Sequence, residues 1–136
     1  MVIISVDYGD VRTGVAACDK LQLLASPVTV IKQKKPELLS EEIKKICLEK
    51  KAEKIVLGLP KNMDGSEGFR AEACKEFAKL LSEKTGLSVD FQDERLTTVS
   101  AHNILNATDT RGKKRKAVVD AVSAVLILED YLRKQN

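Results

Sequence analysis

The feature that most constrains the fold is a short apolar run near the amino terminus that ends at an acid. Residues 2–6 read Val-Ile-Ile-Ser-Val, and Asp7 follows directly. A mostly β-branched run of this length is typical of a central strand that is buried on both faces, as in sheets covered by helices on either side. The sequence therefore predicts an α/β fold whose first strand carries a carboxylate at its carboxyl end.

The rest of the chain alternates strand patterns and helix patterns. After a turn at 8–10, strands are expected over 13–18 and 23–31, the second broken near Pro27, and with the first strand they form an antiparallel meander. Two later strands are expected over 55–59 and 88–92. Helices are expected from Pro36 to about Lys51, from Ser66 to Gly86, after Thr97 or Thr98, and from Ala117 to Leu132. The order βββαβαβαα predicts a mixed five-stranded sheet with packed helices, in a single domain over 1–136.

Composition excludes several classes of protein. With 43% hydrophobic and 32% charged residues, the chain resembles an ordinary globular protein, and no apolar run reaches the roughly 20 residues of a membrane span. The apolar start lacks a basic leader and meets Asp7 early, so we expect no signal peptide, no membrane association and a cytoplasmic location. The three cysteines show no CxxC pairing, which favours reduced core residues over disulfides or a zinc site.

Positive charge is concentrated in one short segment. The net charge of the chain is +3, and its basic block alone supplies five positive charges, so the remainder is net negative. This block consists of Arg111, Lys113, Lys114, Arg115 and Lys116. Such a segment is either a solvated loop or the footprint of a site for a polyanion such as a nucleic acid. We expect it to form a loop ahead of the last helix.

Acidic residues stand at the ends of core elements. Asp7 ends the first strand, Asp93 and Glu94 follow the last strand, and Asp120 lies within an apolar helix. Strand ends of an α/β sheet are where ligands bind, and clustered carboxylates require a compensating cation. Magnesium prefers such oxygen ligands, and a two-metal site of this kind cleaves phosphodiesters. The four acids are therefore candidate metal ligands.

Each acid also has a purely structural interpretation. Asp7 can accept backbone hydrogen bonds in the turn that follows it, and Asp120 can pair with Lys116 one helical turn earlier. Alternation from Val89 and Phe91, both expected to face inward, favours Asp93 as the inward-facing acid, although strand ends twist. The pattern alone does not separate Asp93 from Glu94.

Four stretches of the chain resemble one family. They are VDYGDVRTGVA at 6–16, VLGLPKNMDGSEG at 56–68, DERLTTVSA at 93–101 and KRKAVVDAVSAVLILEDYL at 114–132. Together and in this order they resemble the YqgF/RuvX family, which is described as Holliday-junction-resolvase-like and as nucleases proposed for pre-16S ribosomal RNA. The resemblance implies a ribonuclease-H-like fold and a nuclease that depends on Mg²⁺ or Mn²⁺ and processes precursor ribosomal RNA.

The resemblance also implies roles for individual residues. The catalytic acids correspond to Asp7, Glu94 and Asp120, and phosphate contacts correspond to Arg12, Arg95 and the basic block. Resolvase relatives carry a further acid after the fourth strand, where this chain reads Gly-Leu-Pro at 58–60. The second ligand must then come from Asp93 or Glu94, and a resolvase-type geometry is less well supported.

Three other functions are compatible with parts of this pattern. A DNA junction resolvase would act on branched DNA as a homodimer, whereas a nuclease for ribosomal RNA could act as a monomer, and nothing in the sequence specifies an interface. A non-catalytic RNA-binding or transcription factor could keep the fold, but the three retained acids count against it. Sugar kinases begin with a similar strand-turn-strand motif, yet they need two such domains, and 136 residues allow one.

Overall fold

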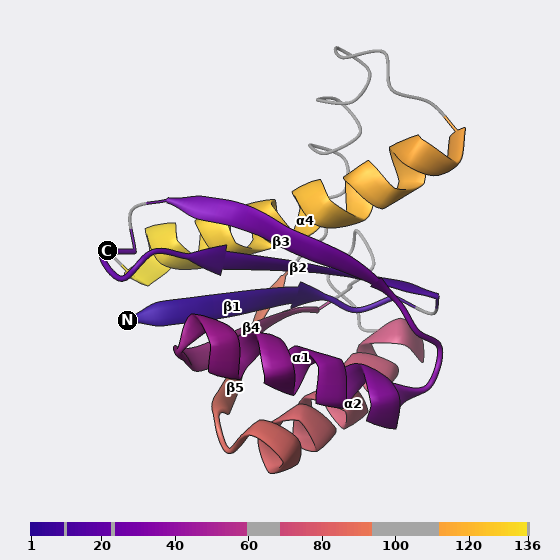
Figure 1. Cartoon of the computed structure of the whole chain (residues 1–136), viewed down its shortest axis with the longest axis horizontal. Coiled ribbons are helices and arrows are strands. Elements are labelled where there is room, and N and C mark those ends of the chain that lie inside the picture. Colours follow the sequence, from indigo (N-terminus) through magenta and orange to yellow (C-terminus); the bar gives the residue numbers. More distant parts are fainter. Residues whose placement is uncertain (10, 23, 60–68, 94–111, 136) are drawn as a thin grey trace.

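The computed structural model describes residues 1–9, 11–22, 24–59, 69–93 and 112–135 (Figure 1). The loop expected at 61–68 and the short helix expected after Thr97 or Thr98 lie outside these residues. Five strands form one mixed sheet in the order β3-β2-β1-β4-β5. They are β1 (Val2–Asp7), β2 (Arg12–Cys18), β3 (Ala25–Lys32), β4 (Ala52–Leu59) and β5 (Ser88–Asp93). The first three strands form the expected antiparallel meander, and β4 and β5 run parallel to β1.

Helices cover both faces of this sheet (Figure 1). On one face lie α1 (Pro36–Lys50) and α2 (Phe69–Thr85), and on the other lies α4 (Gly112–Gln135). The central strand contributes side chains to two hydrophobic cores. Ile4 and Val6 pack toward α1 and α2, whereas Ile3 packs toward α4. Its buried residues on alternating faces confirm that the opening run forms a central strand covered on both sides.

Several local expectations are confirmed. Pro36 occupies the first turn of α1, where its missing N–H costs nothing. Gly86 follows α2 with φ of 73° and donates its amide to the Ser82 carbonyl at 2.9 Å, as a left-handed helix end requires. The register between β2 and β3 shifts where Pro27 faces Ala16. All three cysteines are free and buried.

One expectation was wrong. The last helix begins at Gly112, so the residues Lys113, Lys114, Arg115 and Lys116 belong to its first turns and do not form a loop before it. Lysine and arginine are good helix formers, and glycine at the very first position interrupts no helical hydrogen bond, so nothing in these residues stops the helix. Among the helices of the described residues, none has the length and hydrophobicity that a bilayer crossing needs.

Candidate active site

Asp7 lies half-buried at the carboxyl end of β1, in the middle of the sheet. Side chains alternate along a strand, so Asp7 shares the face of Ile3 and Ser5, which is the face that α4 covers. On β2, the neighbour of Asp7 is Gly14. On β4, Val6 pairs with Leu57, so Asp7 lies next to Gly58, one residue farther along. Both glycines are buried and carry no side chain. The two neighbouring strands therefore contribute no side chain directly beside this carboxylate.

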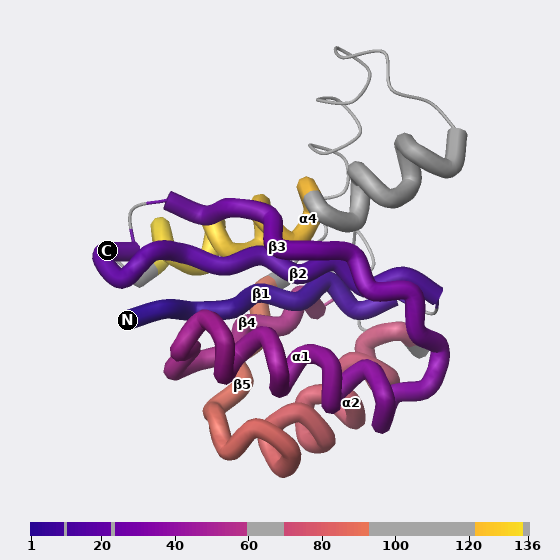
Figure 2. The backbone as a smooth tube through the Cα atoms, in the orientation of Figure 1, coloured from indigo at the N-terminus to yellow at the C-terminus, as the bar shows by residue number. Residues whose placement is uncertain are grey.

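A buried hydrogen bond fixes α4 across β1. The Ser5 hydroxyl donates to the Ala124 carbonyl at 2.6 Å. Farther along α4, Tyr131 contacts Lys54 near the start of β4, so the helix runs antiparallel to β1 and its first half extends toward the carboxyl edge of the sheet. The start of β1 and the end of α4 accordingly lie at the same end of the molecule (Figure 2). Asp120 lies in α4, four residues before Ala124.

The register of β5 separates its two candidate acids. Asp93 is the last residue of β5 and pairs with Leu59. Position 93 has the parity of Val89, which packs against the core beneath α1 and α2, whereas Asp90 has the other parity and bonds to Tyr131 of α4. The alternation that favours Asp93 therefore assigns position 93 to the sheet face opposite that of Asp7. Glu94 lies outside the described residues.

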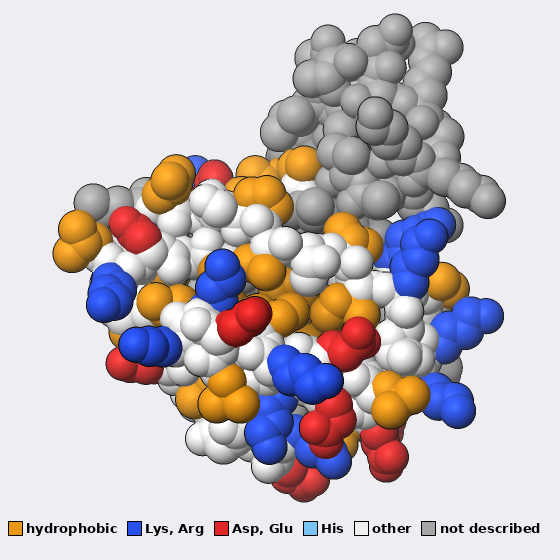
Figure 3. Space-filling model, viewed as in Figure 1, with side chains coloured by type: hydrophobic (Ala, Val, Ile, Leu, Met, Phe, Trp, Pro, Cys, Tyr) orange, Lys and Arg blue, Asp and Glu red, His pale blue; other side chains and the backbone are white. Residues whose placement is uncertain are grey.

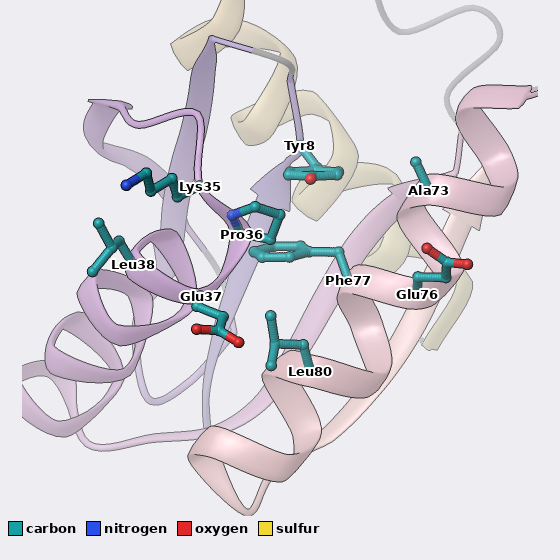
Figure 4. A pocket seen from close by; sticks show the side chains of 9 residues that line it. All are labelled: Tyr8, Lys35, Pro36, Glu37, Leu38, Ala73, Glu76, Phe77 and Leu80. Atoms are coloured by element: carbon teal, nitrogen blue, oxygen red, sulfur yellow. The ribbon is translucent and has the colours of Figure 1, made fainter.

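The residue after Asp7 is held by a three-layer stack. The Tyr8 ring lies parallel to the Phe77 ring, with centroids 4.2 Å apart and planes 7° apart, and both line the groove in Figure 4. The guanidinium of Arg70 lies 5.3 Å from the centroid of the Tyr8 ring, and its Nη2 donates to the Tyr8 carbonyl at 2.6 Å. The first turn of α2 is thereby joined to the end of β1.

The turn after Tyr8 leaves no room for a side chain at Gly9. A Cβ atom at this position would lie 2.1 Å from the carbonyl oxygen of Arg12, a distance that no carbon and backbone oxygen can share. The Gly9 amide faces the hydroxyl of Thr13 at 3.4 Å, a long hydrogen bond. Thr13 therefore accepts a bond from the amide of this turn.

Arg12 is the one proposed phosphate contact whose side chain is described. It stands on β2 two residues before Gly14, the partner of Asp7, and therefore shares its face. Its Nε is buried and finds no hydrogen-bond partner among the described residues. Arg95 and Arg111 lie outside the described residues. The remaining basic residues, Lys113, Lys114, Arg115 and Lys116, lie in α4 toward the same edge of the sheet.

A groove of about 760 Å³ opens between α1 and α2 beside Tyr8. Its floor is apolar, with Phe77 and Leu80, while Glu37 and Glu76 contribute carboxylates (Figure 4). This groove lies on the face opposite the Asp7 carboxylate, and its acids disfavour a phosphate. We therefore place the candidate site at the carboxyl edge of the sheet on the α4 face.

Sequence reasoning identified the acids but missed the groups around them. In the part of the chain that the structure describes, no three metal-binding side chains come together, because Asp7 is the only one of the four acids whose side chain it includes. Arg70, Phe77 and Gly58 lie far from Asp7 in the sequence, whereas Gly14 belongs to the same motif at 6–16. The signal for Gly58 was the missing acid at the end of the fourth strand.

Comparisons with known proteins agree with the α/β fold described above. A family model described as RuvX, Holliday junction resolvase, matches residues 1–134. A protein of Halothermothrix orenii is 46% identical over 136 residues, which is 100% of this chain and 97% of the relative. One of Agathobacter rectalis is 42% identical over 135 residues, covering 97% and 94%. Both carry the provisional name pre-16S rRNA nuclease.

Solved structures show the same fold. The chain superposes on Thermus thermophilus RuvC, solved in complex with a Holliday junction substrate, with a TM-score of 0.63 at 11% identity, covering 100% of this chain and 97% of that one. The fowlpox virus Holliday junction resolvase gives a TM-score of 0.57 at 14% identity, covering 98% and 99%. The fold is the ribonuclease-H-like fold of these resolvases, as expected.

Proposed function

The chain belongs to the RuvX family, and from this membership we propose that it is a magnesium-dependent nuclease that trims precursor ribosomal RNA. The family supports phosphodiester cleavage, and the relatives named for pre-16S rRNA support the substrate. Bacterial ribosomal RNA is processed in the cytoplasm, so this substrate also favours a cytoplasmic location.

The observation that carries the proposal is the hydrogen bond between Ser5 and Ala124. From that contact, Asp7 lies two residues farther along β1, about 6.6 Å toward the carboxyl edge. Asp120 lies four residues back along the antiparallel α4, about 6 Å in the same direction. Backbone positions 7 and 120 therefore lie at a similar level along β1, which supports the proposal that the two acids share a metal ion.

Glu94 is the better candidate for the acid from the last strand. Position 93 has the parity of the core under α1 and α2, so an Asp93 ligand would require the strand end to twist. The proposed catalytic set is Asp7, Glu94 and Asp120, the same set that the family resemblance implies.

The residues at this edge fit a hydrated divalent cation. Carboxylates are preferred by Mg²⁺ and by Mn²⁺, and the strand neighbours of Asp7, Gly14 and Gly58, carry no side chain that would compete with a metal ion for it. Bound metal would lower the pKa of an attacking water and offset the charge on the cleaved phosphate. The stack of Arg70, Tyr8 and Phe77 orients the carboxylate of Asp7, and Arg12, Arg95 and the basic block hold phosphates of the substrate.

The expected mode of recognition is by shape and phosphate. Aromatic residues make up only 4% of the chain, and both described faces of the Tyr8 ring are covered by Phe77 and Arg70. Base stacking is therefore a poor basis for selecting sequences, whereas contacts to phosphates and to RNA shape remain available. A second candidate function, resolution of DNA junctions, follows from the description of the matched family. It requires a homodimer that presents two sites to one junction.

The test is cleavage by Asp7→Asn. Purified wild type is incubated with pre-16S rRNA, single-stranded RNA and a four-way DNA junction, each with magnesium, manganese or chelator. We expect metal-dependent cleavage of the rRNA precursor and a loss of about 1000-fold in Asp7→Asn, since metal catalysis supplies several kcal/mol. Glu53→Gln removes one charge from an exposed site on β4 and serves as the control.

The variants separate the possible mechanisms. Without metal, Asp7→Asn should be at least as stable as wild type in thermal unfolding, because one repelling charge is gone. Full activity in a folded Asp7→Asn protein would rule out the metal mechanism. Cleavage of the junction alone would favour the resolvase.

A further inference from the structure

We propose that Arg12 and Lys32, continued by Lys34, form a phosphate-binding surface along which the nucleic acid leaves the candidate active site across the β2–β3 hairpin. This proposal rests on the proposed nuclease function, and it assigns a path to the substrate. It places one arm of the substrate on the side of the sheet away from β5.

The first observation is an unfavourable pair of like charges. Arg12 and Lys32 stand directly opposite each other on neighbouring antiparallel strands. Such cross-strand partners have Cβ atoms about 5 Å apart, and like charges in this position destabilise a sheet. An anion bound between the two side chains would reverse the sign of that interaction. A phosphate group is such an anion, and it accepts several hydrogen bonds from guanidinium and ammonium groups.

The second observation is an unsatisfied donor in the same pair. The Nε of Arg12 is buried, and none of the described residues accepts its hydrogen bond. A buried donor without an acceptor costs about 1–3 kcal/mol, so most such groups in folded proteins have partners. Together with the repulsion from Lys32, this donor favours an anionic acceptor that the described residues do not supply.

The pair lies on the correct face and at a suitable distance. Arg12 and Lys32 share the face of Asp7, since Gly14 pairs with Asp7 on one side and with Val30 on the other. Strand spacing places Arg12 roughly 8 Å and Lys32 roughly 12 Å from Asp7. At about 3.4 Å of rise per nucleotide, these distances correspond to phosphates two to four nucleotides from the bond that is cut.

The basic surface continues past the end of β3. Gln33 extends the hairpin by donating its amide to Val11 at 3.1 Å, and Lys34 follows, exposed, before α1 begins. Within the described part of the chain no acid pairs with Lys32 or Lys34. Figure 3 shows Lys and Arg side chains along the edge where β3 leads into α1. These charges are solvent-accessible and not neutralised by the protein.

The test compares two double variants that remove the same charge. Lys32→Gln/Lys34→Gln removes the proposed contacts, and Lys50→Gln/Lys79→Gln removes two exposed lysines from α1 and α2. Both are made in an Asp7→Asn background to prevent cleavage. Binding of a labelled single-stranded RNA is measured by fluorescence anisotropy over a range of salt concentrations. The first variant lacks two phosphate contacts to single-stranded RNA, so its slope of log affinity against log salt should be flatter by about 1.4. Its binding at low salt should be at least fivefold weaker. The control pair should keep the wild-type slope.

A stability measurement separates binding from a structural role. Lys32→Gln should raise the midpoint of thermal unfolding at low salt, or leave it unchanged, because it relieves the repulsion from Arg12. Equal slopes for the two double variants, or a Lys32→Gln protein that unfolds at lower temperature, would overturn the proposal. The nuclease proposal fails separately, if RNA is bound with the expected slopes but wild type does not cleave it.

Discussion

At the scale of single residues, Tyr8, the residue that follows Asp7, is held from several sides. Arg70 bonds the Tyr8 carbonyl and covers the Tyr8 ring, Phe77 supports the other face of that ring, and Gly9 leaves no space for the turn to shift. A metal ligand that is fixed by neighbouring groups binds its ion without first losing conformational freedom. The groups that hold Tyr8 in place therefore also help to fix the position of its neighbour Asp7.

Arg70→Lys should impair catalysis more than substrate binding. Lysine keeps the charge but cannot cover the ring and bond the carbonyl at once, so Asp7 loses orientation. We expect kcat to fall about tenfold, the change that roughly 1.4 kcal/mol would cause, with KM within about twofold and a weaker apparent affinity for magnesium. Arg133→Lys, at the far end of α4, is the control. A raised KM with unchanged kcat would instead make Arg70 a substrate contact.

Glu94→Gln should cost far more activity than Asp93→Asn. The register of β5 gives position 93 the parity of the core under α1 and α2, away from Asp7. Single-turnover cleavage at saturating magnesium compares the two variants, and wild-type-like unfolding curves serve as the control for folding. The reverse order of activity would show that the strand end twists and that Asp93 is the ligand.

The residue scale also shows what a sequence can predict. Asp7 was identifiable because a buried strand pattern runs directly into it, and this pattern is local. Arg70 was not, because its bond to Tyr8 joins residues 62 positions apart and depends on how α2 packs. Val89 packs against a core as expected, but Phe91, which was also expected to face inward, is 39% exposed because β5 lies at the edge of the sheet. Periodicity also does not say which of two cores a strand face meets.

At the scale of elements, α4 is attached to the sheet at its middle and near its carboxyl end. Ser5 bonds its middle, and near its end the Tyr131 hydroxyl donates to Asp90 at 2.5 Å and accepts from Lys54 at 3.0 Å. Lys54 also pairs with Asp90 at 3.1 Å. This cluster joins β4, β5 and α4 at the edge opposite Asp7. It therefore sets the position of α4 over the sheet.

Tyr131→Phe should weaken the protein at neutral pH and less so in acid. The hydrogen bond from Tyr131 lowers the pKa of Asp90, against desolvation that raises it. A depressed pKa in the folded state adds stability that is present above the unfolded value, about 3.9, and is lost as pH falls through the folded value. We expect a loss of about 1 kcal/mol in urea unfolding at pH 7 and a smaller loss at pH 3.

Unfolding measured at alkaline pH provides the control for this prediction. Burial, and then the bond to Asp90, raise the pKa of Tyr131, so its contribution is present below the unfolded value of about 10 and declines as pH rises through the folded value. The difference between wild type and Tyr131→Phe should thus shrink at both extremes. A difference that stays constant from about pH 3 to about pH 11 would mean that only packing had changed.

Element order was predictable, whereas one helix boundary was not. Strand and helix periods gave the sequence of elements and the parallel crossovers. The start of α4 was placed five residues too late because a run of basic residues resembles a solvated loop. Lysine and arginine favour helices, so the charge pattern said nothing about the backbone there.

At the scale of the whole molecule, positive charge lies on two sides of the candidate site. One group is the basic block at the start of α4, and the other is the pair of Arg12 and Lys32 with Lys34. The first was apparent from sequence because its residues are contiguous. The second depends on the pairing of β2 with β3. Both groups lie toward the carboxyl edge of the sheet, where a long polyanion could contact them together.

Replacing Lys113, Lys114 and Lys116 with alanine should weaken binding without stopping catalysis. Alanine preserves the helix, and phosphate contacts carry no base information, so all sequences should lose affinity alike. The slope of log affinity against log salt should fall by about 0.7–0.9 for each phosphate that is no longer bound, while cleavage at saturating substrate survives. Lys44, Lys45 and Lys50 replaced together on α1 are the control. Unchanged affinity and slope would leave Arg12 and Arg95 as the main contacts.

The two tyrosines lie at opposite edges of the sheet, and this arrangement provides an optical probe. The chain has two tyrosines and no tryptophan, so all of its ultraviolet emission comes from Tyr8, beside the candidate site, and Tyr131, at the far edge. In a Tyr131→Phe protein, Tyr8 becomes the sole fluorophore, one peptide bond from Asp7. Magnesium titrated into that variant would then be followed at the site itself, without a dye or a substrate.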